Sequence, residues 1–242
     1  MEKKYELTKE KYYDSRAEAV VYRIQALRDF GNVKKGDLGG FVANENNLSH
    51  ANTCWIYDNA IVCGESKVCE GAEVRDSAVV CGTSTIWEST CIFENAYVYN
   101  SVIRGSKIHG NASVNNAEVF WCAEVKDRAI IKGGHIDTDV VIADNATVYG
   151  DSYISGYNIT IGKNASIVNG KVLSNDDWRV FGGYNGTYVT WLRQGNYFVL
   201  NENRYTAYDI MEYALKVGGY ALANTISAIA GVEILKAQEA KI

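Results

Sequence analysis

The chain has 242 residues, of which 47% are hydrophobic, and a formal net charge of −5 at pH 7. This composition can fill an extended core, whereas the weak, even acidity argues against a nucleic-acid-binding surface and against DNA mimicry. The start, Met1–Tyr5, lacks a signal-peptide apolar run, and no segment approaches the roughly 18 apolar residues of a membrane span, so we expect a cytoplasmic protein.

Residues 1–50 differ in composition from residues 51–173 and should form a separate unit. Strands are expected at Lys4–Thr8 and Val20–Leu27, followed by a glycine-rich stretch. Lys34 and Lys35 in that stretch could bind an anion, although the spacing matches no phosphate loop. The alternative is a cap that covers the first coil of the next unit, which would otherwise present an unpaired edge.

Residues 51–173 carry a repeat in which a β-branched residue returns about every sixth position. The spacing is strictly six at first and then varies between five and seven, and it gives 21 positions: Ile56, Val62, Val68, Val74, Val80, Ile86, Ile92, Val98, Ile103, Ile108, Val114, Val119, Val125, Ile131, Ile136, Ile142, Val148, Ile154, Ile161, Ile167 and Val172. At three sides to a coil, these positions make seven coils.

A small residue such as Ala60 or Ser66 often stands four positions later, and turn pairs such as Asp58-Asn59 lie between. The β-branched residue suits a short strand that points inward, and the small residue suits a tight corner. This hexapeptide pattern is typical of a parallel β-helix, whose coils bury their inner sides against each other. We predict the left-handed, triangular form.

The repeat also assigns outward residues to three sides. The first side carries Tyr57, Arg75, Phe93, His109 and Lys126; the second Cys63, Cys81, Tyr99, Asn115, Lys132 and Tyr149; the third Cys69, Trp87, Arg104, Phe120 and Asp137, with His135 and Tyr153 nearby. On the second side Ile61, Val79, Tyr97 and Tyr99 form an apolar strip, which we expect either to mediate self-association or to pack a terminal segment.

The six cysteines include no CxxC pair, so we expect no metal. In a reducing compartment they should behave as small hydrophobic residues. Cys63 and Cys81, 18 positions apart, should stack on adjacent coils, where oxidation outside the cell would be unsurprising.

Residues 174–242 leave the repeat and are expected to form an α+β module. Short antiparallel strands are predicted at Arg179–Phe181, Thr187–Arg193 and Tyr197–Leu200, with Gly182-Gly183, Asn185-Gly186 and Gly195-Asn196 as turns. Thr206, with Asp209 three positions later, should cap a helix that ends near Val217. A second helix should begin near Ala221.

The segments Tyr22–Gly31, Val33–Gly40 and Cys54–Ala60 resemble the start of uncharacterised hexapeptide-repeat proteins of phages and prophages. The tail around Phe181–Gly183 is similar to tails found in some of them. The resemblance implies the fold more firmly than an activity, and it implies a bacterial host cell as the setting.

An enzyme is the first functional hypothesis, because many left-handed β-helices resemble acyltransferases that use acyl-CoA and a histidine base. The chain has three histidines, His50, His109 and His135, and His109 and His135 fall on different sides. Asp137 could orient His135, which is the one catalytic candidate. A structural histidine explains the same pattern, so we favour a protein without catalysis or cofactor.

A binding protein is the second hypothesis. A rigid oligomer, most simply a homotrimer, could sequester an anionic small molecule such as a signalling nucleotide used in bacterial defence. Aromatic rings would stack on a base and cations would pair with phosphate. The candidate ligand-binding residues are Trp87, Tyr99, Arg104, Phe120, Trp121 and Lys126.

A scaffold or an inhibitor of a bacterial defence protein is the third hypothesis. The C-terminal module contains clustered aromatic residues, and Tyr, Trp and Arg dominate interface hot spots. The candidate partner-binding residues are Tyr188, Trp191, Arg193 and Tyr205, with Trp178, Tyr184 and Tyr197 close in sequence. A small β module also needs an aromatic core, which is the favoured interpretation.

Overall fold

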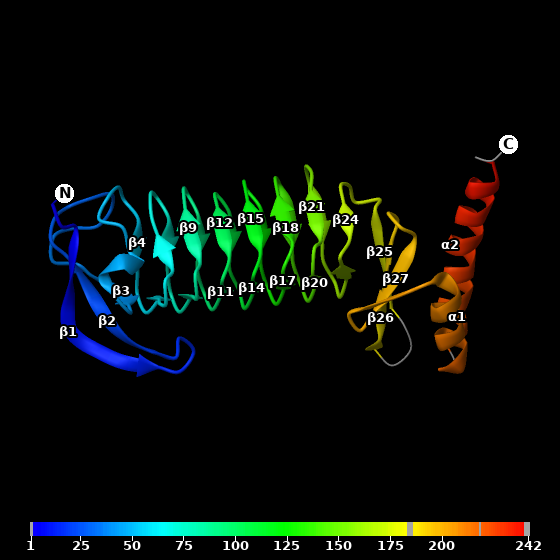
Figure 1. Cartoon of the computed structure of the whole chain (residues 1–242), viewed down its shortest axis with the longest axis horizontal. Helices are drawn as coiled ribbons and strands as arrows, with labels where there is room; N and C mark the ends of the chain where they lie inside the picture. Colours follow the sequence, from blue (N-terminus) through cyan, green and yellow to red (C-terminus); the bar gives the residue numbers. More distant parts are fainter. Residues whose placement is uncertain (1, 183–185, 218, 240–242) are drawn as a thin grey trace.

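The computed structural model describes residues 2–182, 186–217 and 219–239. Figure 1 shows an elongated rod of stacked three-sided coils, with a β-hairpin at one end and an antiparallel sheet followed by two helices at the other. The coils form three parallel sheets that run along the rod. The predicted left-handed β-helix of about seven coils, with an N-terminal β cap and a C-terminal α+β module, is confirmed.

Each side of the rod is one parallel sheet with one strand from every coil. Side 1 comprises β4 (Trp55–Ile56), β7 (Glu73–Val74), β10 (Cys91–Ile92), β13 (Lys107–Ile108), β16 (Glu124–Val125), β19 (Val140–Ile142) and β22 (Ile159–Ile161). Side 2 comprises β5 (Ile61–Val62), β8 (Val79–Cys81), β11 (Tyr97–Tyr99), β14 (Ser113–Asn115), β17 (Ile130–Lys132), β20 (Thr147–Tyr149) and β23 (Ser166–Val168). Side 3 comprises β6 (Lys67–Val68), β9 (Thr85–Trp87), β12 (Val102–Arg104), β15 (Glu118–Phe120), β18 (His135–Asp137), β21 (Tyr153–Ser155) and β24 (Lys171–Val172).

The 21 β-branched residues predicted to point inward are all fully buried, at 0% exposure. Neighbouring coils align them directly, as in the pairs Val98↔Val114 and Ile103↔Val119. Burying one such side chain stabilises the fold by about 1.5–3 kcal/mol. The repeat therefore supplies both the core and the register between coils.

The corners are held together by polar side chains that reach from one coil to the next. At the corner between sides 1 and 2, the Asp58 carboxylate accepts the backbone N–H of Asp76 at 3.2 Å, and the Asp76 carboxylate accepts that of Glu94 at 2.8 Å. Asp58, Asp76 and Glu94 all have positive φ angles. The small residues after them are buried, as expected for tight corners; Ala60 and Ala78 are examples.

The N-terminal unit extends the sheet of side 2 rather than forming a separate layer. It contains β1 (Tyr5–Asp14), β2 (Ala19–Ala26), β3 (Leu38–Val42) and the short 3-10 helix η1 (Glu45–Asn47), with β3 parallel to β5. The strand β1 is longer than expected, and β3 was not expected. Its Gly39 and Gly40 allow close approach, since a Cβ at either would lie about 2.6 Å or less from a backbone oxygen of the first coil.

Both lysines of the glycine-rich stretch are exposed, and Asp29 contacts each of them. The Asp29 carboxylate accepts a hydrogen bond from the Lys34 ammonium at 3.1 Å and one from the Lys35 backbone N–H at 2.9 Å. The carboxylate thus already pairs with the Lys34 ammonium. The geometry therefore favours the capping interpretation of the stretch.

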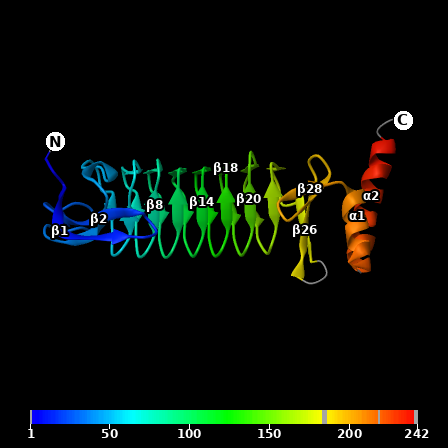
Figure 2. The same cartoon turned by 60° about the horizontal axis from the view of Figure 1, so that its bottom comes forward.

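The hairpin of β1 and β2 covers the apolar strip on side 2 (Figure 2). Val21 and Phe41 pack with Ile61 and Val79 in one buried cluster, against which Tyr97 also packs. Of the two expected roles for this strip, the structure shows packing of a terminal segment. At the hairpin tip the Arg16 guanidinium donates to the Ser77 carbonyl at 2.9 Å.

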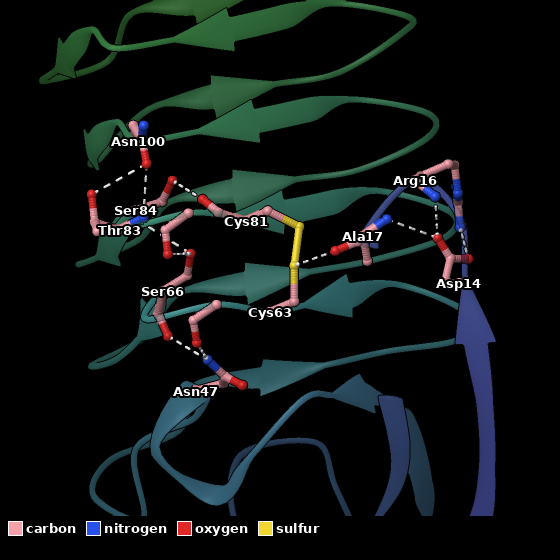
Figure 3. Close-up of a disulfide and its surroundings, with 12 residues drawn as sticks. Asp14, Arg16, Ala17, Asn47, Cys63, Ser66, Cys81, Thr83, Ser84 and Asn100 are labelled. Atoms are coloured by element: carbon pink, nitrogen blue, oxygen red, sulfur yellow. Dashed lines mark hydrogen bonds and ion pairs between the residues drawn. A yellow bond between two sulfur atoms is a disulfide. The ribbon is translucent and has the colours of Figure 1, made fainter. Parts of the chain in front are cut away.

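Cys63 and Cys81 lie beneath the hairpin tip on adjacent coils, as their spacing predicts. They form a disulfide, the oxidation that stacking on adjacent coils makes possible. Figure 3 shows the disulfide facing Ala17. Cys54, Cys69, Cys91 and Cys122 are free thiols.

The C-terminal module is an antiparallel sheet packed between the last coil and two helices. The sheet comprises β25 (Trp178–Gly182), β26 (Tyr188–Leu192), β27 (Tyr197–Leu200) and β28 (Asn203–Tyr205), and the helices are α1 (Ala207–Lys216) and α2 (Tyr220–Glu239). Thr206 and Asp209 form the predicted capping box. The strand β28 was not expected. The turn predicted at Gly183 and at Asn185-Gly186 lies largely outside the described residues.

The last coil is closed by side chains of this sheet. The Arg204 guanidinium donates to the Val168 carbonyl through Nε at 2.9 Å and also contacts the Asn169 carbonyl. The Tyr197 hydroxyl donates to the Val168 carbonyl at 2.9 Å. These donors satisfy carbonyl groups that would otherwise be unpaired at the end of the rod.

We predict that Asp76→Ala lowers the free energy of unfolding by about 2 kcal/mol, because it removes a carboxylate acceptor and places alanine at positive φ. Asp76→Asn should cost less than half as much, because asparagine keeps the acceptor and tolerates this backbone. Thermal unfolding followed by circular dichroism measures both, with the exposed Glu65→Ala as control. Equal losses for the two Asp76 variants would contradict the proposed role of the corner carboxylates.

Candidate functional site

His135, the catalytic candidate, has both ring nitrogens facing carboxylates. Its Nδ1 lies 2.9 Å from Glu118 and its Nε2 lies 3.6 Å from Asp137, while the ring stacks on Tyr153. A general base needs a nitrogen that can reach a substrate proton. This geometry instead matches a structural histidine within a column of stacked side chains.

His109 and Lys126 on side 1 are joined by one carboxylate. Glu124 lies 2.9 Å from the His109 ring and 3.0 Å from the Lys126 ammonium. Burial acts to raise the pKa of Glu124, but the hydrogen bonds from His109 and Lys126 outweigh it and leave the pKa below its ordinary value. Lys126, a predicted ligand-binding residue, is thus already paired with an anion inside the fold.

Tyr99, another predicted ligand-binding residue, lies apart on side 2. Its ring is nearly parallel to that of Tyr97, with centroids 6.4 Å apart. Both rings line a cavity of about 550 Å³ between the hairpin tip and the disulfide. Because the hairpin occupies this side, Tyr99 does not join the other predicted residues.

The four remaining candidates, Trp87, Arg104, Phe120 and Trp121, lie together on side 3. The Arg104 guanidinium is 4.7 Å from the Trp87 ring centroid and 5.5 Å from that of Trp121. The Phe120 and Trp121 centroids are 5.9 Å apart. The sequence repeat places Trp87, Arg104 and Phe120 on one side, and the strand register confirms this column.

Next to this column, the corner between sides 3 and 1 is hollowed. We call this hollow the corner groove: it has a volume of about 540 Å³ and is lined by Glu70, Gly71, Glu88, Ser89, Gly105, Trp121 and Cys122. A second cavity of about 260 Å³ shares Ser89, Gly105 and Cys122 and continues to Lys107 and Glu124. The hollow therefore runs over several successive coils.

A short step in the repeat creates the corner groove. From side 3 to side 1 the chain takes six residues between Val68 and Val74 and between Val119 and Val125, but five between Ile103 and Ile108. The shortened corner turns at Gly105, which has a φ of +57°. A Cβ there would lie 3.4 Å from the Glu88 carboxylate and 4.0 Å from Trp121 Cα, so glycine leaves the space open.

Trp121 and Cys122 form the opposite wall in an unusual backbone conformation. Their φ angles are +46° and +67°, a region that bulky residues rarely adopt. The conformation is held by backbone hydrogen bonds from Trp121 to the Arg104 carbonyl and from Cys122 to the Gly105 carbonyl. Trp121 is 49% exposed, and strained backbone of this kind concentrates at functional sites.

The electrostatics of the corner groove do not favour a free anion. Arg104 hydrogen-bonds Glu88 through Nε at 2.6 Å and also forms an ion pair with it. The hydrogen bond to Glu88 raises the pKa of Arg104. Its guanidinium is thus engaged, and the carboxylates of Glu70 and Glu88 line the opening.

Sequence reasoning found Trp121 but missed Glu70, Glu88, Gly105 and Cys122. The roles of these four residues depend on which corners stack in space. The aromatic residues, in contrast, could be selected by residue type alone. The five-residue step at Ile103 was the available signal, because it alone shortens the passage from side 3 to side 1.

The predicted partner-binding residues of the C-terminal module do not share one surface. Trp191 and Tyr205 pack against the cluster formed by the sheet and the helices, and the Trp191 indole donates to Asn196 at 2.9 Å. Tyr188 and Arg193 are exposed. Tyr197 contacts the last coil, and Tyr184 lies outside the described residues. The favoured core interpretation thus describes Trp191 and Tyr205.

No protein-family model matches the chain, and no curated protein matches it. Within residues 2–182, 186–217 and 219–239, no helix is long and apolar enough to cross a membrane. The same described residues contain no group of three or more His, Cys, Asp and Glu side chains placed to hold a metal ion.

We predict that Cys122 is the first thiol to react with iodoacetamide in the folded protein. Cys122 is exposed, whereas burial raises the pKa values of the Cys54, Cys69 and Cys91 thiols. Peptide mass spectrometry over time measures the order, and Cys122→Ser should remove the fast phase. Labelling of any other cysteine before Cys122 would contradict the exposed position of Cys122 in the wall of the groove.

Proposed function

We propose that this chain is a non-catalytic binding protein that holds part of another protein in its corner groove. The observation that carries the proposal is the half-exposed Trp121, fixed by a left-handed backbone over an acidic hollow. Tryptophan is enriched at the centres of protein interfaces. The stacked coils supply a rigid support, which lowers the entropy lost on binding.

Binding of a protein is better supported than sequestration of an anion. Arg104 and Lys126 would have to leave Glu88 and Glu124 before either could pair with a phosphate. His135 has a carboxylate at each ring nitrogen, which argues against the acyltransferase alternative. A purely structural scaffold has no need for a half-exposed tryptophan at positive φ.

The resemblance to phage hexapeptide-repeat proteins supplies the setting of the proposal. In that setting the protein acts in the cytoplasm of a bacterial host and blocks a bacterial defence protein. Self-association, with a homotrimer as the first candidate, belongs to the same proposal. A trimer would present three corner grooves and would raise the apparent affinity for a multivalent partner.

A photo-crosslinker attached to the natural Cys122 thiol tests the proposal in a lysate of a bacterial host. We expect a discrete crosslinked product, because the label lies in the wall of the groove. Gly105→Asn should abolish it, since asparagine tolerates the left-handed backbone but fills the hollow. His135→Ala should leave it unchanged.

The matched control carries the crosslinker at another exposed corner, in the double variant Cys122→Ser with Asn111→Cys. That control should give no such product. A product that survives in Gly105→Asn, or that the control gives equally well, would contradict the assignment of the groove.

A further inference from the structure

The two carboxylates of the corner groove are not equivalent. Glu88 forms an ion pair with Arg104. One Glu70 oxygen accepts the backbone N–H of Glu88 at 3.1 Å, but within the part of the chain that the structure describes no cationic side chain forms an ion pair with Glu70 within 4.0 Å. The groove therefore contains one carboxylate in a direct ion pair and one, Glu70, that interacts with Arg104 only at longer range.

Arg104 shows how this corner already holds a cationic group. Its guanidinium lies against the rings of Trp87 and Trp121 and hydrogen-bonds the Glu88 carboxylate. A cation near an indole face and a carboxylate gains from both interactions. Trp121 and Glu70 both line the groove, separated by the corners of Glu88 and Gly105, and offer an indole and a carboxylate at its two ends.

The positions of the charged residues along the groove favour binding of a cationic group at the Glu70 end. Lys107 lies in the second cavity, on the far side of Gly105, where it would repel a cation. Trp121 lies at the opposite end of the lining from Glu70, and its half-exposed side chain can cover an aliphatic stem. The lining thus suits a side chain with an apolar stem and a cationic head.

We propose that the corner groove takes an arginine side chain of a partner protein, with its stem against Trp121 and its guanidinium at Glu70. This inference rests on the proposed function and names the chemistry of the partner. The planar guanidinium suits it better than an ammonium, because it stacks on aromatic rings and pairs with a carboxylate through two parallel hydrogen bonds.

Nuclear magnetic resonance of the tryptophan indole N–H groups tests the inference, with Trp121→Phe to assign the Trp121 signal. The probe is N-acetyl-arginine amide, and the uncharged citrulline analogue is its isosteric control. We expect the arginine probe to shift the Trp121 signal saturably and the citrulline probe to shift it much less. Glu70→Gln should weaken binding about 2- to 5-fold, as for an exposed ion pair.

Glu65→Gln removes the same charge at a different corner and should leave the affinity unchanged. Equal shifts with both probes, or equal weakening by Glu70→Gln and Glu65→Gln, would overturn the inference. If either of these results is obtained but Cys122 still crosslinks to a bacterial protein, the proposed function stands and the arginine ligand is rejected. If the crosslink is lost but the groove still prefers the arginine probe to the citrulline probe, only the protein-binding function is rejected.

Discussion

Burial of one β-branched side chain per side, against the same position of the next coil, is the constraint on which the rest of the structure depends. A single coil cannot cover Val98 or Ile103; each needs the coils before and after it. The coils must therefore stack in register, and their open ends must be closed. The hairpin with β3 closes one end, and Arg204 and Tyr197 help to close the other.

The same register fixes what the outer surface can do. Side chains on successive coils are forced into columns, and some charged groups find a partner within them, as Arg104 finds Glu88 and Lys126 finds Glu124. A regular rod offers few concave sites. The corner groove arises where the repeat loses one residue at Gly105, so the departure from the pattern, rather than the pattern, creates the candidate site.

The core could be predicted from the sequence because it depends on local spacing, and all of the inward residues are buried as expected. The strands β3 and β28 were missed because β3 contains two glycines and β28 is short. Residue type marked Trp121 as a candidate, but the pairing of Arg104 with Glu88 was not predictable, since it requires knowing which corners stack. Because that pairing engages Arg104, it favours a protein over an anionic ligand.

Restoring the missing residue tests the central claim most directly. One serine inserted between Gly105 and Ser106 would give this corner the six-residue step of its neighbours. Our account predicts that the insertion keeps the circular dichroism spectrum and the unfolding temperature close to those of the parent, while the Cys122 crosslink to a host protein disappears. A well-folded insertion variant that still gives the crosslink would contradict the claim that the short corner builds the binding site.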